Sequence, residues 1–175
     1  EIDQIKQILF QHGYKYLDTI GEGSFASVFL CQSFKYNNLF AIKRVSKNEL
    51  VEQEINALIK LFHPYIIKLY STFSDDDHSY LVMEYCPNGT LKQKCNLEYD
   101  KFIFYAKQVL EVLDYCHSQK IAHRDIKPDN IFIDQYDHIK LGDFGFARHF
   151  DSKNIADQKL GSLLYCAPEM LDMAE

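Results

Sequence analysis

Residues 123–130 read HRDIKPDN, and this short segment decides how the rest of the chain is interpreted. It contains acids, strong bases and an amide, which are costly to bury unless they pair with one another or with a ligand. A solvated loop of charged side chains is the alternative. Asp143-Phe144-Gly145 follows 18 residues after Asp125, and Ala167-Pro168-Glu169 comes later still. Several such motifs in one order favour a functional site over a solvated loop.

A glycine-bearing turn lies nearer the N-terminus, where residues 21–26 read GEGSFA. Strands are expected on either side of it, over Tyr16–Ile20 and Val28–Gln32. Glycines in such a turn let backbone N–H groups approach a phosphate. For an isolated motif, a hairpin whose glycines need positive φ is the alternative. A dinucleotide-binding fingerprint is excluded, because a strand and not a helix follows the turn.

Composition narrows the class of protein. The 175 residues correspond to one domain, or to one and a fragment, and 47% hydrophobic residues are typical of a globular protein. A net charge of −6 argues against a basic nucleic-acid-binding surface, and the lack of an 18-residue apolar run excludes a membrane span. Five scattered cysteines without a C-x-x-C pair, and no signal peptide, predict buried thiols in an intracellular, cytoplasmic protein.

Hydrophobic periodicity predicts strands first and helices afterwards. Expected helices cover residues 1–12, 49–61 and Tyr99–Gln119; further strands are expected over Phe40–Val45, Ile66–Phe73, Ser79–Tyr85, 131–134 and 139–141. The apolar face of the longest helix is expected to carry Phe102, Tyr105, Val109, Val112, Leu113 and Cys116. The change of pattern near residue 86 predicts an α+β protein with two lobes.

Over essentially its whole length the chain resembles the eukaryotic protein kinase family, through the motifs quoted above and Phe40-Ala41-Ile42-Lys43. The resemblance implies a bilobal kinase fold with a five-stranded antiparallel N-lobe sheet, one N-lobe helix and a mainly helical C-lobe. It divides the chain into an N-terminal helical extension (1–13), an N-lobe (14–86) and the first part of a C-lobe (87–175). Because family members continue past the Ala-Pro-Glu motif, the C-lobe is expected to be incomplete.

The resemblance also implies catalytic and metal-binding roles. Asp125 would be the catalytic base, and Lys127 would neutralise charge on the moving phosphoryl group. Asn130 and Asp143 would bind Mg²⁺, which prefers hard oxygen ligands.

Lys43 would hold the α- and β-phosphates of ATP and pair with a glutamate on the following helix. Glu54 matches that position better than Glu49 or Glu52, because it lies nine residues before His63.

The same resemblance implies an ATP site with Met83 as gatekeeper, Glu84 to Cys86 as hinge and Phe132 as floor. Thr90 stands where many relatives carry a ribose-binding acid. The full set of expected nucleotide-binding residues is Gly21, Glu22, Gly23, Ser24, Phe25, Val28, Ala41, Lys43, Met83, Glu84, Cys86, Thr90 and Phe132. An apolar spine would contain Leu58, Leu69, His123 and Phe144.

Lys127, two residues after Asp125, is the serine/threonine pattern of the family, and Ser162 matches its peptide-binding loop. We therefore expect a Mg-dependent serine/threonine protein kinase acting on protein substrates. The sequences of its later motifs are most similar to those of the calmodulin-dependent and AMP-activated kinase group. Asp129 could favour a basic substrate context. A catalytically inactive nucleotide-binding scaffold is the alternative, should the later C-lobe helices be missing.

Overall fold

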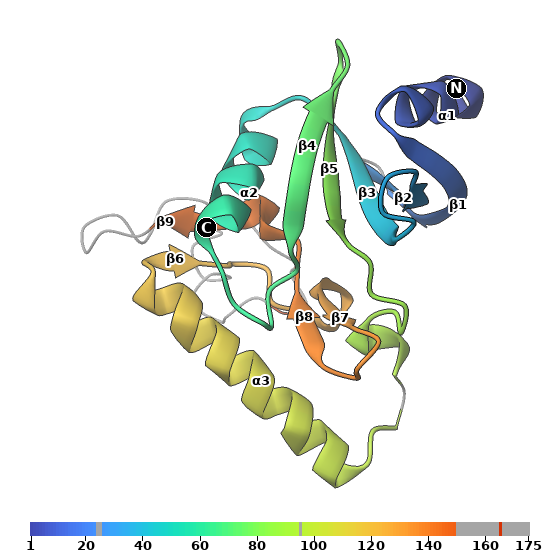
Figure 1. Ribbon diagram of the computed structural model, residues 1–175. Coiled ribbons are helices and arrows are strands. Elements are labelled where there is room, and N and C mark those ends of the chain that lie inside the picture. The colour runs from blue at the N-terminus through green and yellow to red at the C-terminus, as the bar shows by residue number, and fades with distance from the viewer. Residues whose placement is uncertain (24–25, 95, 150–164, 166–175) are drawn as a thin grey trace. The chain divides into compact units, whose positions relative to one another are not determined.

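The computed structural model describes residues 1–23, 26–94, 96–149 and 165 (Figure 1). Contacts divide the chain into two units: unit 1 is Glu1–Val51 with Lys68–Tyr85, and unit 2 is Glu52–Ile67 with Cys86–Glu175. The predicted domain limits at residues 13 and 86 stay predictions. Within the described part of the chain, no helix combines the length and the apolar character needed to cross a bilayer.

Unit 1 contains the five-stranded antiparallel sheet that the sequence predicts. Its strands are β1 (Tyr14–Glu22), β2 (Ala26–Ser33), β3 (Leu39–Ser46), β4 (Leu69–Ser74) and β5 (His78–Glu84), in the order β1-β2-β3-β5-β4 (Figure 1). Because side chains alternate between the faces of a strand, each strand contributes to both faces of the sheet.

One face of this sheet is covered by the N-terminal helix α1 (Ile2–Gln11), which the sequence predicts. Ile5 and Leu9 of α1 are 5% and 0% exposed. They share a core with residues of β2, β3 and β5, namely Phe29, Cys31, Phe40, Ile42, Tyr80 and Val82. The amphipathic pattern of residues 1–12 therefore buries its apolar side against aromatic and aliphatic side chains.

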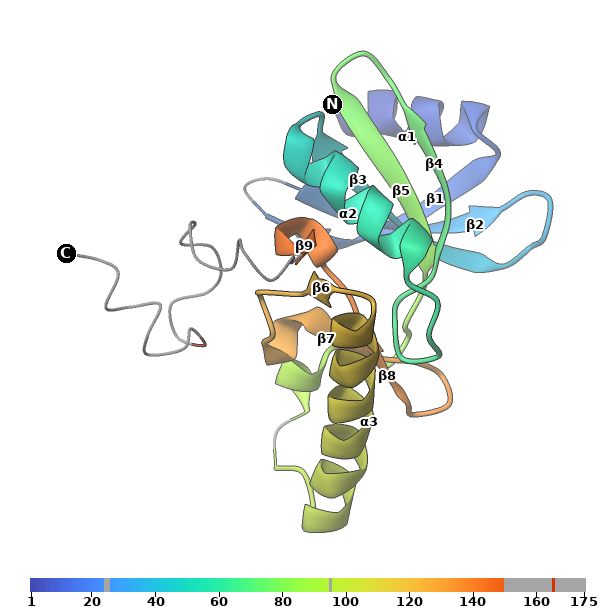
Figure 2. The same cartoon turned by 90° about the vertical axis from the view of Figure 1, so that its left-hand side faces the viewer.

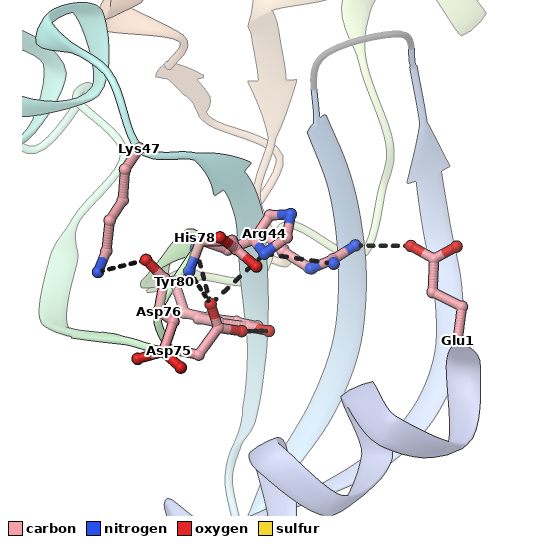
Figure 3. A network of polar contacts seen from close by, with 8 residues as sticks. Glu1, Arg44, Lys47, Asp75, Asp76, His78 and Tyr80 are labelled. Atoms are coloured by element: carbon pink, nitrogen blue, oxygen red, sulfur yellow. Dashed lines mark hydrogen bonds and ion pairs between the residues drawn. The ribbon is translucent and has the colours of Figure 1, made fainter.

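A polar cluster ties the β4–β5 turn to the sheet (Figure 3). Asp75 Oδ1 accepts hydrogen bonds from the backbone N–H groups of Asp77 (2.9 Å) and His78 (2.7 Å), and Oδ2 accepts one from the Tyr80 hydroxyl (2.8 Å). Arg44 of β3 lies 3.4 Å from His78 Nδ1 and donates to Glu1 Oε1 at 3.2 Å. We call Asp75 with these donors the turn cluster.

The predicted start of the fourth strand is wrong. The sequence predicts a strand from Ile66, but β4 begins at Leu69. Ile66 and Ile67 belong to unit 2, where Ile66 bridges Leu141 and the Ile67 N–H donates to the Leu141 carbonyl (2.9 Å). Their apolar character reflects burial in a different unit and not membership of the sheet.

Unit 2 is built around helices and short strands. Helix α2 (Glu49–Lys60) lies mostly in this unit, and α3 (Tyr99–Ser118) lies beside the hairpin of β7 (Ile131–Ile133) and β8 (Ile139–Leu141) (Figure 2). A second small pair joins β6 (Ile121–Ala122) to β9 (Arg148–His149). The 3₁₀ turns are η1 (Leu91–Gln93), η2 (Pro128–Asn130) and η3 (Phe144–Phe146).

The predicted apolar face of α3 is confirmed at Tyr105, Val112 and Cys116, which are buried, but it is wrong at Phe102. Phe102 is 55% exposed, whereas Gln108 is 4% exposed. The Gln108 Oε1 atom accepts a hydrogen bond from the Ile139 N–H of β8 at 3.0 Å. A buried amide can therefore replace an apolar side chain here, because it satisfies a backbone donor.

Among the described cysteines, Cys31, Cys86 and Cys116 are buried, as the sequence predicts. Burial raises the pKa of Cys31 to about 12 and that of Cys116 to about 11, which leaves these two thiols protonated and unreactive. Cys95 and Cys166 lie outside the described residues.

Candidate active site

The segment 123–130 lies between two short strands of unit 2. It follows β6, which pairs with β9, and precedes β7, which pairs with β8. Its last three residues form η2, with Pro128 at the first turn, where a missing N–H costs nothing. Both ends of the segment are thus fixed by strand pairing.

The carboxylate of Asp125 is the centre of this segment, and its side chain is only 1% exposed. The Lys127 ammonium donates to Asp125 Oδ2 at 2.7 Å, and the Asn130 amide donates to the same oxygen at 2.9 Å. The Asn130 amide also donates to the Asp125 carbonyl at 2.9 Å. Because the acid is buried against a cation and an amide, the solvated-loop alternative is wrong.

His123 connects this loop to the segment that carries Asp143. Its Nε2 lies 2.9 Å from the Gly142 carbonyl, and its Nδ1 accepts the Asp125 N–H at 3.3 Å. This pair of contacts requires the neutral tautomer with hydrogen on Nε2. Burial lowers the pKa of His123, which also favours the neutral ring.

The predicted spine residues His123 and Phe144 are in contact, with ring centroids 4.6 Å apart in an edge-to-face arrangement. Both are buried in unit 2, as is Leu58 of α2, whereas Leu69 belongs to unit 1.

Asp143 is positioned next to the segment 123–130, the predicted catalytic loop. The Gly142 N–H donates to the Asn130 carbonyl at 2.9 Å, and Asp143 itself adopts a left-handed backbone with φ of 58°. A Cβ atom on Gly142 would lie 2.9 Å from the Phe132 ring, so only glycine permits this approach.

The donor chemistry of Asn130 and Asp143 fits Mg²⁺. The Asn130 amide nitrogen is committed to Asp125, so the atom that it can offer to a metal is Oδ1. Asp143 offers a carboxylate. No cluster of three or more His, Cys, Asp or Glu residues that could hold a metal occurs among the described residues. Mg²⁺ is usually bound through one or two carboxylates, and phosphates and water complete its coordination.

Glu54 lies in the same unit, on α2, and is 3% exposed. A Cβ atom placed on Gly145 would lie 3.9 Å from Glu54 Oε2 and 3.6 Å from Asp143 Oδ1, so both carboxylates flank this glycine. Glu49 and Glu52 are exposed. The structure therefore distinguishes Glu54 from the two other candidates by burial.

Four of the expected nucleotide-binding residues of unit 1 share one face of the sheet. Val28 pairs with Lys43 across β2 and β3, and Ala41 pairs with Met83 across β3 and β5. Alternation along the strands places these four side chains on the face opposite to the one that α1 covers. The core residues and the candidate site residues thus occupy opposite faces of one sheet.

The glycine turn extends this arrangement. Gly21 pairs with Val28, and the Gly23 N–H donates to the Ala26 carbonyl at 2.9 Å. The turn joins an antiparallel hairpin, and its glycines, Gly21 and Gly23, are not among the described glycines with positive φ, which are Gly13 and Gly89. Glu22 ends β1, and Ser24 and Phe25 lie outside the described residues.

The remaining expected nucleotide contacts are divided between the units. In unit 1, the Glu84 N–H donates to the Lys68 carbonyl at 2.9 Å. In unit 2, Cys86 is buried, and Thr90 forms an isolated bridge with Phe132. Ser162 and Ala167-Pro168-Glu169 lie outside the described residues.

One ion pair of the catalytic loop was not predicted from the sequence. It joins Lys92 Nζ to Asp129 Oδ1, which is in the loop, at 2.7 Å. The two residues are 37 positions apart in the chain, and no periodicity or motif connects them.

A family model described as "Protein kinase domain" matches residues 14–175. The chain belongs to the protein kinase family. A probable myosin light chain kinase of Dictyostelium discoideum is 38% identical over 90% of this kinase chain and 35% of its own length. The cAMP-dependent protein kinase catalytic subunit of Schizosaccharomyces pombe is 34% identical over 91% of this chain and 33% of its own length.

A carbon catabolite-derepressing protein kinase of Saccharomyces cerevisiae is 32% identical over 90% of the kinase chain and 27% of its own length. The chain thus spans about a third or less of the length of these relatives. The family match begins at residue 14, so helix α1 of this kinase chain lies ahead of the matched segment.

Proposed function

We propose that this protein is a serine/threonine protein kinase that transfers the γ-phosphate of ATP to a serine or threonine hydroxyl of a protein, with Mg²⁺ as the metal. The observation that carries the proposal is the buried carboxylate of Asp125, held by the side chains of Lys127 and Asn130. The printed names of the relatives, which include several protein kinases, support the same reaction class.

In this proposal Asp125 accepts the proton of the acceptor hydroxyl and orients its oxygen toward the γ-phosphorus. Lys127, whose ammonium already contacts the Asp125 carboxylate, neutralises charge on the phosphoryl group. His123 is a positioning residue, because its contacts with the Asp125 N–H and the Gly142 carbonyl fix the loop in place.

Mg²⁺ would supply charge neutralisation at the phosphates when bound, and Asn130 Oδ1 with the Asp143 carboxylate would hold it. Lys43 would bind the phosphates and pair with Glu54. The glycine turn, Val28, Ala41, Met83, Glu84, Cys86, Thr90 and Phe132 are the proposed nucleotide contacts. The serine/threonine acceptor rests on the position of Lys127, and a cytoplasmic location stays a prediction.

The proposal is tested by transfer of labelled γ-phosphate from ATP·Mg to a generic protein substrate. Asp125→Asn should lower the rate of transfer by at least about 10²-fold, while ATP binding, followed by fluorescence of a nucleotide analogue, persists. Asp100→Asn, a change of the same kind at an exposed residue of α3, is the matched control and should transfer normally. Nucleotide binding without any transfer by the unaltered protein would identify a nucleotide-binding scaffold and overturn the proposal.

A further inference from the structure

The Lys92–Asp129 ion pair is not used by the proposed mechanism. Lys92 lies in η1 and Asp129 in η2, the turn that ends the catalytic loop. Their side chains are 63% and 36% exposed, so the pair is accessible at the surface of unit 2. The hydrogen bond to Asp129 raises the pKa of Lys92, so the amine keeps its charge at neutral pH.

The backbone holds the two turns side by side. The Ile133 N–H of β7 donates to the Gly89 carbonyl at 2.9 Å, and the Asn88 N–H donates to the Ile133 carbonyl at 3.3 Å. Thr90, which precedes η1, bridges Phe132 of the same strand. Since β7 begins directly after η2, both turns are attached to one strand, and the position of Lys92 next to Asp129 is built into the fold.

The pair also lies within reach of an acceptor peptide bound at Asp125. Asp129 is four residues after Asp125, and four residues span at most about 14 Å. Side chains two to four residues away from an acceptor serine cover the same range, about 7 to 14 Å. A peptide whose hydroxyl contacts Asp125 can therefore bring a flanking side chain to Asp129.

From this arrangement we infer that Lys92 is a specificity-determining residue: by pairing with Asp129, it withholds that carboxylate from basic side chains of acceptor peptides. An unpaired carboxylate would attract a peptide arginine through a charge-assisted, bidentate contact. With Lys92 in place, the local charge is balanced, so a basic residue near the acceptor gives no advantage over a neutral one. This inference rests on the proposed function and differs from the expectation that Asp129 favours a basic context.

The test compares pairs of acceptor peptides that differ in one residue, arginine or alanine, at each of positions two to four on either side of the serine. The measured quantity is the ratio of kcat/KM for the arginine and alanine members of each pair. The unaltered protein should give a ratio near one at every position. Lys92→Ala should raise the ratio at one or more positions by roughly two- to fivefold, as expected for a single exposed ion pair.

Two further variants make the result specific. Lys94→Ala removes a neighbouring exposed lysine and should leave the ratio unchanged. Lys92→Ala combined with Asp129→Asn should return the ratio to near one, because no carboxylate remains to be released. An unchanged ratio in Lys92→Ala, or an equal rise in Lys94→Ala or in the double variant, would overturn the inference.

Failure of the proposed function can be distinguished from failure of this inference. If the unaltered protein binds ATP but transfers no phosphate to any peptide, the proposed function fails. The same arginine and alanine peptides, fluorescently labelled, are then compared by equilibrium binding, for which the same ratios are expected. Binding that is equal for both peptides in all variants would overturn the role of Lys92.

Discussion

Two aspartates, one in each unit, are surrounded by donors in different ways. In the turn cluster of unit 1, Asp75 accepts two backbone N–H groups and the Tyr80 hydroxyl (Figure 3). In the catalytic loop of unit 2, Asp125 Oδ2 accepts the side chains of Lys127 and Asn130. Backbone donors fix the path of the chain, whereas side-chain donors can rearrange when a substrate arrives. The comparison indicates a structural role for Asp75, and it is in line with the proposed catalytic role of Asp125.

The largest expected difference between the two clusters is in catalysis. Asp125→Asn should lower the rate of phosphate transfer by about 10²- to 10⁴-fold, as is typical for loss of a general base. Asp75→Asn should leave that rate within about twofold, since loss of a structural contact in the β4–β5 turn does not remove a reacting group. Steady-state assays of both variants at a temperature where both are folded check this. A comparable loss of rate in Asp75→Asn would contradict the division of roles.

The next largest effect is on the free energy of unfolding, through the core between α1 and the sheet. Tyr80 of the turn cluster belongs to this core. Leu9→Ala should lower the free energy of unfolding by about 2–5 kcal/mol, because it removes a fully buried side chain from the interface between α1 and the sheet. Gln7→Ala, at an exposed position of the same helix, is the control and should change it by less than about 0.5 kcal/mol. Urea unfolding measures the free energy of unfolding of both variants. If Leu9→Ala lowered it no more than the control does, α1 would not support the sheet.

A smaller effect is expected within the turn cluster itself. Tyr80→Phe keeps the buried ring but removes the hydroxyl that donates to Asp75 Oδ2. The free energy of unfolding should fall by about 1 kcal/mol, the usual contribution of one hydrogen bond. Thermal unfolding measures the change. When Asp75→Asn is added to Tyr80→Phe, the free energy of unfolding should fall further only by the contribution of the two backbone hydrogen bonds. Strictly additive effects of the two substitutions would argue against a shared network.

The smallest predicted effect is a difference in pH dependence. Burial tends to raise the pKa of Asp75, but the hydrogen bonds from His78, Tyr80 and Asp77 lower it overall. The stability that Asp75 contributes is therefore fully present above its ordinary pKa, near 4, and is lost as the pH falls through the lower folded value. Urea unfolding between about pH 5 and 2 should show a shallower acid loss in Asp75→Asn than in the unaltered protein.

The catalytic loop should also respond to acid, through His123. Because burial lowers the pKa of this ring, its contribution is present above the ordinary histidine value near 6.5 and is lost as the pH falls through the lower folded value. NMR titration of the ring detects the transition. A ring that titrates at or above its ordinary value would contradict the neutral tautomer that links the two segments.

The sequence predicts features that depend on local pattern. The five strands, α1 and α3 follow from periodicity, and Asp125 and Asn130 follow from a motif in which both residues lie close together in the chain. Features that depend on distant partners were missed. Phe102 looks like a core residue by spacing but is 55% exposed, whereas Gln108, a polar residue, is 4% exposed.

The same limit explains two further differences. Ile66 and Ile67 look like the start of a strand, but their hydrogen bonds go to Leu141, which is far away in the sequence. Lys92 belongs to no recognised motif. Its position beside Asp129 follows from the attachment of η1 and η2 to the same strand, which only the structure shows. Side chains whose roles depend on such long-range contacts cannot be identified from spacing alone.

Helix α1 has a practical consequence for anyone who redesigns this protein. The family match starts after it, yet Ile5 and Leu9 complete the core of the sheet. A chimera that took only the matched segment from this protein would place Phe29 and Phe40 against a helix of foreign sequence, or against water. Exposed aromatic surface of that kind promotes aggregation. Residues 2–11 and the sheet should therefore be transplanted as one cassette.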